Sequence, residues 1–480
     1  MGPTTHYRGG RRDRTDGPVS AAVWAVVFAA ALSSAAIMAM PSTDTPGWRM
    51  WTFARLHQQL YAPVVEGWNA SGKTHVRVDL LSIPALQRRI LSAFMSRTPV
   101  ADVVEVERQM AGRAFSGPIE SVGFVDLTDR LRREGLLEQV NAPSFSAWTS
   151  RGRIFGLPHD VHPVMLAYRT DLVQSAGIDV STIETWDDFA RVLAPLMADN
   201  NGDGAPDRYL LNLWETQVDN LELLILQAGG SFFDERGRPA LATPINARVL
   251  ATIVSWTRGP GRIAAEAPDF SASGNKLKLD GYVVAAFMPD WMCNIWKNEI
   301  PQLAGRVKVM PLPAWEPGGR RTSVWGGTML GIPSTAQDIE GLWSFAKHLY
   351  LSPELARATY KVGDIITPVR KYWNDPVFDE PDSYFCQQRK GRMYIDLAPT
   401  VPLRTSSPYN VIAQLRVQDA LIALGAYADR ARRYRPAELT DEAARLLANA
   451  EIELRRHMDR NVFLREDAER DPHGTPGRPR

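Results

Sequence analysis

Four groups of polar and aromatic residues stand where predicted strands end, or where the chain passes from one predicted sheet to another. They are Glu105 with Glu107; His159 with Asp160 and His162; Asp290 with Trp291; and Trp325 with Gly326 and Gly327. Carboxylates accept hydrogen bonds from several hydroxyls at once, and an indole offers an apolar face to the C–H side of a sugar ring. Glycines allow backbone N–H groups to approach a ligand closely. Together these residue types indicate a site for a polar, ring-shaped ligand.

Each of these residues also has a structural interpretation. Trp291 and Trp325 could be packing residues, and Asp160 could hold backbone amides at a hinge. Glu107 could be a solvated loop carboxylate, and His159 a surface or satisfied histidine. The binding hypothesis depends on the placement of these residues at several separate strand ends, because open α/β sheets bind ligands beyond the carboxyl ends of their strands.

A second candidate site is an Asp-rich segment that resembles an extracellular calcium loop. The oxygen ligands would be Asp199, Asn201, Asp203 and Asp207. Their spacing, with Gly204 at the turn, suits Ca²⁺. Leu210 stands where a bidentate Glu is usual, so the site would be incomplete unless another segment lends a carboxylate. The alternative is an Asx-rich turn after a helix.

The sequence lacks the common motifs of catalysis. It contains no Gly-x-Ser-x-Gly, no His-Glu-x-x-His and no phosphate-cradling Gly-rich segment. Paired carboxylates for glycoside hydrolysis could occur among the 54 acidic residues, because sequence spacing does not report their separation in space. We therefore predict that the protein is not an enzyme, and retain a glycan-active enzyme as an alternative.

Strands and helices that would position these residues alternate along the chain. Strands are predicted at 49–54, 76–80, 101–106, 282–288 and 307–313, and helices at 61–68, 86–95, 185–197, 342–351 and 411–427. This order predicts mainly parallel sheets with covering helices. Residues 157–163 read as a passage between two such bodies, and residues 325–333 as the return to the first. The predicted fold class is therefore α/β with two bodies.

Size and charge narrow the function further. A chain of 480 residues is long enough for two or three domains. The net charge is +1, from 55 basic and 54 acidic residues, which provides no general attraction for nucleic acid. The 14 Trp fit both core packing and a ring-stacking site.

The N-terminal region indicates export. Residues 19–40 are apolar or small, and at ~1.5 Å per residue they can span a bilayer core of about 30 Å. The four Arg in residues 8–14 favour a cytoplasmic N-terminus and an exported bulk, in the periplasm or at the cell surface. The segment is either an uncleaved transmembrane anchor or a signal peptide, for which Ala35, Ala36 and Ala39 could supply the cleavage site.

The chain has two cysteines, Cys293 and Cys386. They could pair in an oxidising compartment, but nothing in the sequence shows that they meet. Without a Cys-x-x-Cys they form no metal or redox motif.

Several blocks, in matching order, resemble family 1 extracellular solute-binding proteins of ABC importers, the maltodextrin-binding type. The blocks lie at 101–104, 152–160, 168–172, 185–189, 201–204, 229–230, 287–291, 309–313 and 326–333. The resemblance implies two α/β lobes, each a mainly parallel sheet covered by helices, joined by crossing hinge strands. It also implies closure on a sugar or related solute, delivery to a membrane permease, and a monomer with no required cofactor.

The resemblance carries a set of ligand-binding positions. They are Glu107, His159, Asp160, Trp214, Asp290, Trp291, Trp325, Gly326, Gly327 and Tyr409. Trp214 and Tyr409 rest on family position alone and could equally be core residues. Two departures stand out: no Cys follows the apolar segment to carry a lipid, and Asp290 adds a carboxylate that argues against a phosphorylated ligand.

The implied organisation is discontinuous. It comprises a basic cytoplasmic region 1–18, the apolar segment 19–40, lobe 1 at 48–158 and 322–375, lobe 2 at 159–321 and 376–462, and a disordered tail 463–480. A membrane-anchored ligand-sensing or scaffold protein on the same fold is an alternative to the importer subunit. The sequence does not name the sugar or the permease.

Overall fold

The computed structural model describes residues 47–197, 199, 202 and 204–461, with Trp24 and Phe28 as single residues before them. The chain divides into two units, residues 1–46 and 47–480, and the fold below is that of the second. The predicted segments 1–18, 19–40 and 463–480 lie outside the described residues, apart from Trp24 and Phe28. None of the helices in the described part is long and apolar enough to cross a membrane.

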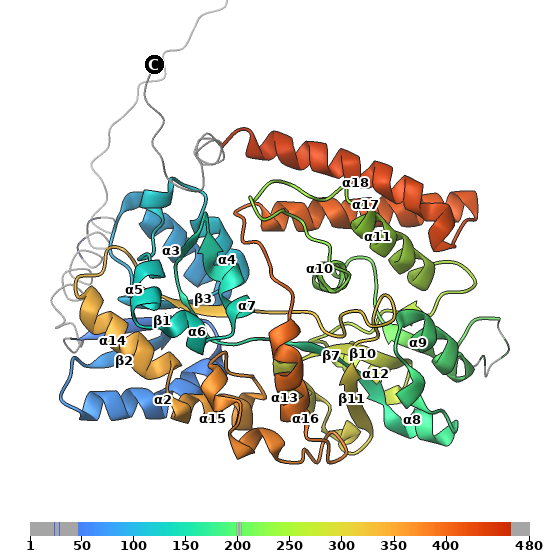
Figure 1. Cartoon of the computed structure of the whole chain (residues 1–480), viewed down its shortest axis with the longest axis horizontal. Coiled ribbons are helices and arrows are strands. Elements are labelled where there is room, and N and C mark those ends of the chain that lie inside the picture. The colour runs from blue at the N-terminus through green and yellow to red at the C-terminus, as the bar shows by residue number, and fades with distance from the viewer. Residues whose placement is uncertain are drawn as a thin grey trace, which may run out of the picture. The chain divides into compact units, whose positions relative to one another are not determined.

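The first sheet has five strands in the order β2-β1-β3-β12-β6 (Figure 1). The strands are β1 Trp48–Thr52, β2 Val76–Leu80, β3 Val103–Glu107, β6 Leu157–Pro158 and β12 Thr328–Gly331. β1 pairs in parallel with β2 and β3, whereas β12 is antiparallel to β3 and β6. Four of the five strands therefore run in one direction, and β12 is reversed.

Both faces of the first sheet are buried, which explains its apolar strands. Neighbouring residues of a strand point to opposite faces. Met50 and Val103 accordingly belong to one hydrophobic cluster, and Trp51 and Val104 to another. Sheets covered on both faces need such nearly continuous apolar runs.

The second sheet has the order β11-β7-β10-β8-β9. The strands are β7 Val164–Arg169, β8 Tyr209–Asn212, β9 Ala264–Ala265, β10 Val283–Pro289 and β11 Val307–Pro311. β7 is antiparallel to β10 and β11, and the remaining pairs are parallel. β7 and β10 are buried along their whole length. This arrangement confirms the predicted α/β class with two mainly parallel sheets.

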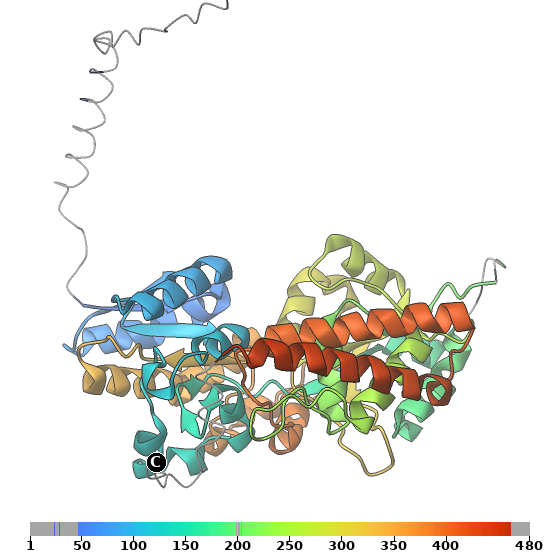
Figure 2. The same ribbon diagram turned by 90° about the horizontal axis from the view of Figure 1, so that it is seen from above.

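Helices cover both sheets (Figure 1). They are α2 Arg55–Ala70, α3 Ile83–Ser96, α4 Arg108–Ala114, α5 Thr128–Arg133, α6 Leu136–Gln139, α7 Ala142–Phe145, α8 Thr170–Ser175, α9 Trp186–Leu193, α10 Val218–Gln227, α11 Pro244–Thr257, α12 Ala272–Asp280, α13 Asp290–Glu299, α14 Ile339–Tyr350, α15 Pro353–Gly363, α16 Lys390–Leu397, α17 Asn410–Ala431 and α18 Pro436–Met458. A short hairpin, β4 Thr149–Ser150 with β5 Arg153–Ile154, precedes β6. The long helices α17 and α18 lie side by side (Figure 2) and pack into the core of the second sheet.

A capping box begins α9, at the start of the helix predicted for 185–197. Thr185 Oγ1 accepts a hydrogen bond from the Asp188 N–H at 3.1 Å, and Asp188 Oδ2 accepts one from the Thr185 N–H at 3.0 Å. The helix ends at Leu193, earlier than the predicted 197, and a 3-10 turn follows. Pro195 lies in that turn; proline lacks the N–H that a continuing helix would need.

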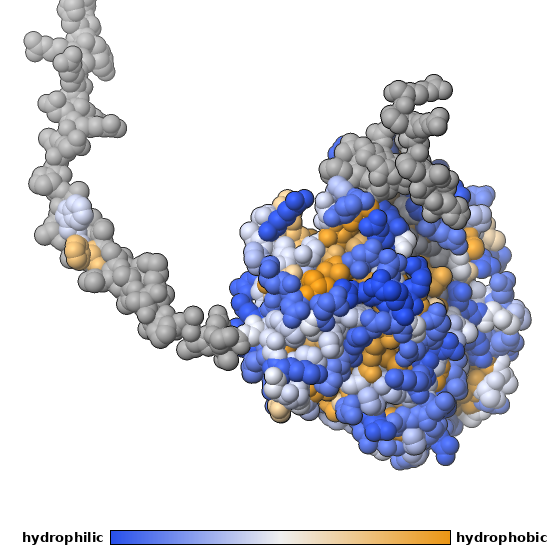
Figure 3. Space-filling view, turned by 60° about the vertical axis from the view of Figure 1, so that its left-hand side comes forward, coloured by the Kyte–Doolittle hydropathy of each residue, from blue (hydrophilic) through white to orange (hydrophobic). Residues whose placement is uncertain are grey.

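Both cysteines are free thiols. Cys293 is buried, with its sulfur 3.3 Å from the Tyr394 hydroxyl, and Cys386 lies 3.4 Å from the Val307 carbonyl oxygen. Burial raises the pKa of Cys293 to about 12, so this thiol is unreactive at neutral pH. The surface seen in Figure 3 is mostly hydrophilic with scattered apolar patches, as is usual for a folded chain in water.

Candidate functional site

Glu107 lies where the first sheet ends and α4 begins. Its carboxylate accepts a hydrogen bond from the Gln109 N–H at 2.9 Å, which caps the helix. Burial raises the pKa of Glu107. In the sheet Glu107 is the register partner of Thr328, the first residue of β12. The predicted strand-end position is therefore correct, and the side chain is mostly buried rather than a solvated loop carboxylate.

Glu105, two residues earlier, is a core residue. Its buried carboxylate accepts hydrogen bonds from Thr52 at 2.8 Å, from Tyr350 at 3.1 Å and from Tyr61, and it contacts His57 Nδ1 at 2.8 Å. These partners belong to the helices and strands of the first sheet. Since they saturate the carboxylate, Glu105 has no free acceptor for a ligand.

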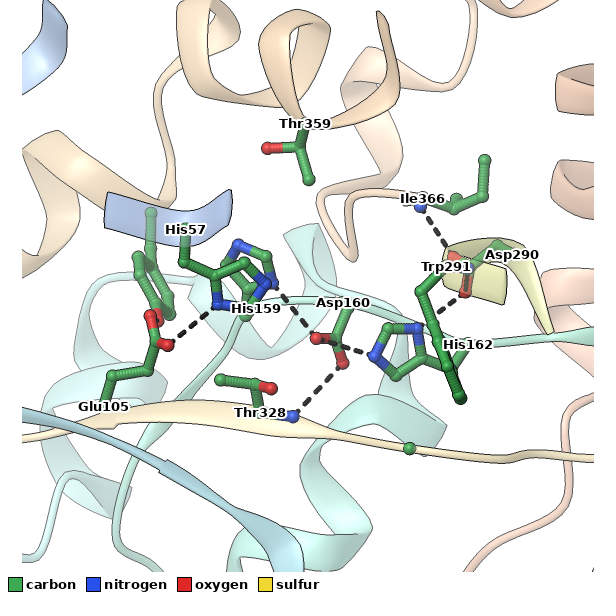
Figure 4. A network of polar contacts seen from close by, with 12 residues as sticks. His57, Glu105, His159, Asp160, His162, Asp290, Trp291, Thr328, Thr359 and Ile366 are labelled. Carbon is green, nitrogen blue, oxygen red and sulfur yellow. Dashed lines mark hydrogen bonds and ion pairs between the residues drawn. The ribbon is translucent and has the colours of Figure 1, made fainter. Parts of the chain in front are cut away.

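A chain of buried histidines and carboxylates runs along the segment between the sheets (Figure 4). Asp160 Oδ2 lies 3.1 Å from His159 Nδ1 and 2.9 Å from His162 Nε2. His162 Nδ1 lies 2.7 Å from Asp290 Oδ1. All four residues are buried. The structure thus brings the crossing segment into contact with the end of β10.

The charges of His162 and its two carboxylate partners stabilise one another. Burial alone would lower the pKa of His162, but the carboxylates of Asp160 and Asp290 prevail and raise it to about 10. Burial would raise the pKa of Asp160, yet the charge of His162 and the hydrogen bonds of both histidines hold it far below its ordinary value. His162 is therefore an imidazolium between two carboxylates at neutral pH.

His159 faces the first core instead of the other predicted site residues. Its ring centroid lies 4.4 Å from that of His57 and 5.2 Å from that of Tyr350. Burial, and then the charge of His57, lowers its pKa, so it is neutral. His159 is therefore a buried histidine rather than a surface one, and its ring contacts Asp160 through Nδ1.

Two tryptophans meet beside the glycine pair. The Trp291 indole N–H donates to the Trp325 carbonyl oxygen at 2.9 Å, and the rings cross at 80° with centroids 5.5 Å apart. Phe270, 60% exposed, lies parallel to Trp291 with centroids 6.2 Å apart. Trp291 is half-buried, so part of its ring is available to a ligand.

Gly326 permits this close packing. Its φ of +108° lies in a region that side chains rarely adopt, and a Cβ would lie 2.8 Å from His162 Cδ2 and 3.0 Å from Trp291 Nε1. Gly327, with φ of +126°, accepts a hydrogen bond from the Arg108 N–H at 3.2 Å. Both glycines are thus required by backbone conformation and by close approach.

Sequence reasoning missed a charged group beside these residues. Arg108 forms a bidentate ion pair with Glu222, at 3.1 and 2.7 Å, and Gln414 donates to Glu222 at 2.8 Å. Arg404 is buried and donates to the Gly326 carbonyl oxygen, but it forms no ion pair with another described residue. Burial and the charge of Arg108 lower the pKa of Arg404 to about 9. Arg404 and Glu222 line one small pocket with Ser231, Phe233 and Thr405.

Asp219 belongs to the same charged group. Burial, and then the charge of Glu222, raises its pKa, while Arg108, Arg404 and a hydrogen bond with Trp325 oppose the rise. The sequence did contain one signal for this group. Glu222 is the one carboxylate in the otherwise apolar run 221–226 of α10. Because a charged side chain is rarely buried without a partner, its position indicates a buried cation nearby. Arg404 lies in a polar loop and had no comparable signal.

The remaining predicted positions are less closely connected. Trp214 is half-buried after β8, and Tyr409 is half-buried before α17, against the core of the second sheet. Among the described residues, no hydrogen bond, ion pair or ring contact joins either of them to Trp291 or Asp160. The structure therefore brings together Asp160, Asp290, Trp291, Trp325 and Gly326, with Glu107 and Gly327 adjoining through the backbone of β12 and α4.

The predicted calcium loop is described only in part, since Asn201 and Asp203 lie outside the described residues. Asp199 accepts hydrogen bonds from the Gly202 N–H at 2.7 Å and the Gly204 N–H at 2.9 Å, three and five residues further on, within an Asx-rich turn. Within the described ranges, no group of three or more His, Cys, Asp or Glu side chains could hold a metal ion.

Comparison with known proteins identifies the family. Residues 53–354, more than half of the chain, match the bacterial extracellular solute-binding proteins. The chain belongs to this family, which confirms the predicted resemblance.

Curated relatives carry sugar-binding names. The arabinooligosaccharide-binding protein of Halalkalibacterium halodurans is 23% identical over 70% of this chain and 74% of its own length. The lactose-binding protein of Rhizobium radiobacter is 22% identical over 66% of this chain and 72% of its own length. Among solved structures, the sugar-binding protein MalE of Xanthomonas citri has a TM-score of 0.67 and 17% identity, over 86% of this chain and 99% of that one. At this identity the structural likeness shows the fold alone.

Proposed function

We propose that this protein captures a sugar or oligosaccharide between its two sheets and delivers it to the permease of an ABC importer. The observation that carries the proposal is the half-buried Trp291, whose indole N–H is fixed by the Trp325 carbonyl oxygen. The Asp290 carboxylate holds its backbone N–H, and the Arg404 guanidinium holds the neighbouring Gly326 carbonyl oxygen. An indole face with hydrogen-bonding groups around it suits a sugar ring. The sugar-binding names of the relatives support the same ligand class.

The ligand-binding residues of this proposal are those that meet near the glycine pair. They are Glu107, Arg108, Asp160, Asp219, Asp290, Trp291, Trp325, Gly326, Gly327 and Arg404, with Trp214 and Tyr409 from the family resemblance alone. Closure would occur about the segments that cross between the sheets. A ligand favours the closed state only by binding it more tightly than the open one.

The organisation around this core is also part of the proposal. Lobe 1 would comprise 48–158 and 322–375, and lobe 2 would comprise 159–321 and 376–462. The protein would act as a monomer outside the cytoplasm. Segment 19–40 would either anchor it in the membrane or be cleaved as a signal peptide, which would release it. N-terminal sequencing of the exported protein separates the two: a start near Met40 means cleavage.

A thermal-shift screen of the full chain tests the binding function. The panel holds arabinotriose, lactose, maltotriose, a β-galactobiose, polyols and amino acids. A true ligand at 100 times its dissociation constant should stabilise the protein by about 2.7 kcal/mol. Trp291→Ala should lower the shift to about half or less. The control is Trp48→Ala, which removes a half-buried indole at the first residue of β1, next to Trp68. This variant should keep the ligand-induced shift in melting temperature.

The same screen separates the alternatives. If no sugar shifts the melting temperature while an amino acid or polyol does, the ligand class is wrong. Release of a shorter glycan during incubation would favour the enzyme alternative. A sugar that binds without any permease-dependent uptake in cells would favour the sensing or scaffold alternative.

A further inference from the structure

His162 occupies the point where separate parts of the chain meet. It lies in the segment between β6 and β7, and its carbonyl oxygen accepts a hydrogen bond from the Trp325 N–H at 3.4 Å, in the segment before β12. Its ring packs against Gly326: a Cβ added to that glycine would lie only 2.8 Å from His162 Cδ2. The two segments that join the sheets therefore touch at this histidine.

The imidazolium connects these segments to the start of α13. Both of its N–H groups have carboxylate partners, Asp160 at 2.9 Å and Asp290 at 2.7 Å. Asp290 Oδ2 also accepts a hydrogen bond from the Ile366 N–H at 2.8 Å, in the segment after α15 (Figure 4). Asp290 is thus held from two sides by groups far apart in the sequence.

The same carboxylate holds Trp291. Asp290 Oδ1, the oxygen that contacts His162, accepts a hydrogen bond from the Trp291 backbone N–H at 2.8 Å. The other end of Trp291 is fixed by its indole N–H on the Trp325 carbonyl oxygen at 2.9 Å. His162 therefore contacts both groups that hold Trp291: the Asp290 carboxylate on its backbone and the Trp325 residue on its indole.

The backbone of His162 supports a specific role. Its φ of +54° lies in the left-handed region, which residues other than glycine rarely adopt. Such strained positions persist where the surroundings fix them, and they cluster at ligand sites.

We propose that His162 is a positioning residue: its doubly paired imidazolium fixes the Trp291 ring in the orientation that binds the sugar. This inference rests on the proposed sugar-binding function, but its effect on the indole does not require a ligand. Only a side chain with two outward N–H donors can serve both carboxylates. Glutamine at this position would direct its carbonyl oxygen at one of them.

His162→Gln is the test, and His57→Gln is its matched control. His57 is a second buried histidine paired with a carboxylate, at 2.8 Å from Glu105. Within the described part of the chain its contacts lie in the first core and do not include Trp291. Both variants should lower the melting temperature. The Trp291 indole N–H resonance, assigned by its loss in Trp291→Phe, should move only in His162→Gln. The dissociation constant for the best sugar of the panel should rise at least about tenfold in His162→Gln and stay unchanged in His57→Gln.

The outcomes are distinct. An unchanged indole resonance and an unchanged dissociation constant in His162→Gln would overturn the proposal. If no panel sugar binds the wild type, the sugar-binding function fails, and the indole resonance still decides whether His162 positions Trp291. If His162→Gln does not fold, Asp290→Asn replaces it: the amide cannot accept from both Ile366 and Trp291 while pairing with His162, so the same resonance should move.

Discussion

Arg108 and Glu222 form a bidentate ion pair, at 3.1 and 2.7 Å, between a helix that follows the first sheet and a helix that packs on the second. Their side chains are only 8% and 11% exposed. The pair joins elements of the two sheets beside the glycine pair, where the sugar is proposed to bind. It therefore contributes to the geometry of the site as well as to stability.

Removal of one partner of this pair should be costly. Glu222→Gln removes the ion-pair partner of the buried Arg108 guanidinium, a change that typically costs about 3–5 kcal/mol. Urea denaturation of the variant should show that loss in the free energy of unfolding. Asp129→Asn, in the exposed pair with Arg132, should change it by less than about 1 kcal/mol. Equal effects of the two variants would contradict the buried role of Glu222.

Stability should depend on pH through His162. Its pKa is raised from 6.5 to about 10 by Asp160 and Asp290, which face it. Because folding raises this pKa, protonated His162 stabilises the folded state fully below pH 6.5, and that contribution is lost as pH rises toward 10. The melting temperature of the wild type should therefore fall over this range more steeply than that of His162→Gln. Parallel curves would show that His162 does not titrate as argued.

Stability should also depend on pH through Asp160, but at acid pH and in the opposite direction. Its pKa is lowered from 3.8, so its stabilising contribution is present above that value and is lost as pH falls below it. Acid unfolding monitored by circular dichroism should occur at higher pH in His162→Gln, because the charge that holds the Asp160 carboxylate ionised is gone. Unchanged acid midpoints would contradict this coupling.

Gly326→Ala should damage both folding and binding. The added Cβ would meet His162 and Trp291 in addition to straining the backbone. Gly305→Ala provides the control, since Gly305 has φ of +71° and nothing within 4 Å of the added Cβ. The control should cost about 1–2 kcal/mol from conformation alone. A cost for Gly326→Ala no greater than that of the control would remove the argument from close contact.

Calcium binding to the Asp199 segment remains a separate prediction. If Ca²⁺ bridges Asp199, Asn201, Asp203 and Asp207, a chelator should lower the melting temperature, and added Ca²⁺ should restore it. Asp207→Asn should weaken the response. An identical melting temperature with and without chelator would leave the Asx turn of Asp199 as the whole explanation.

The sequence predicted the sheets well because their signals are local. Runs such as Val283–Pro289 are apolar throughout, and the Thr185–Asp188 capping box acts over three residues. The same signals placed Glu107 at the end of a strand of the first sheet, and Asp290 with Trp291 at the end of a strand of the second.

The contacts within the site could not be predicted in the same way. Arg108 and Glu222 are far apart in sequence, and nothing local indicates that they pair. His159 and His162 lie on either side of Asp160 in the sequence, yet one faces the first core and the other Asp290. That difference depends on the left-handed backbone of His162, which no composition or spacing reports.

The central claim is that Trp291 binds a sugar between the two sheets. Isothermal titration calorimetry of the full chain with the best sugar of the panel tests it most directly, with Trp291→Ala beside the wild type. We predict one binding event per chain in the wild type and a dissociation constant at least about tenfold higher in the variant. Equal dissociation constants for the two proteins, or no binding of any panel sugar to a folded wild type, would contradict it.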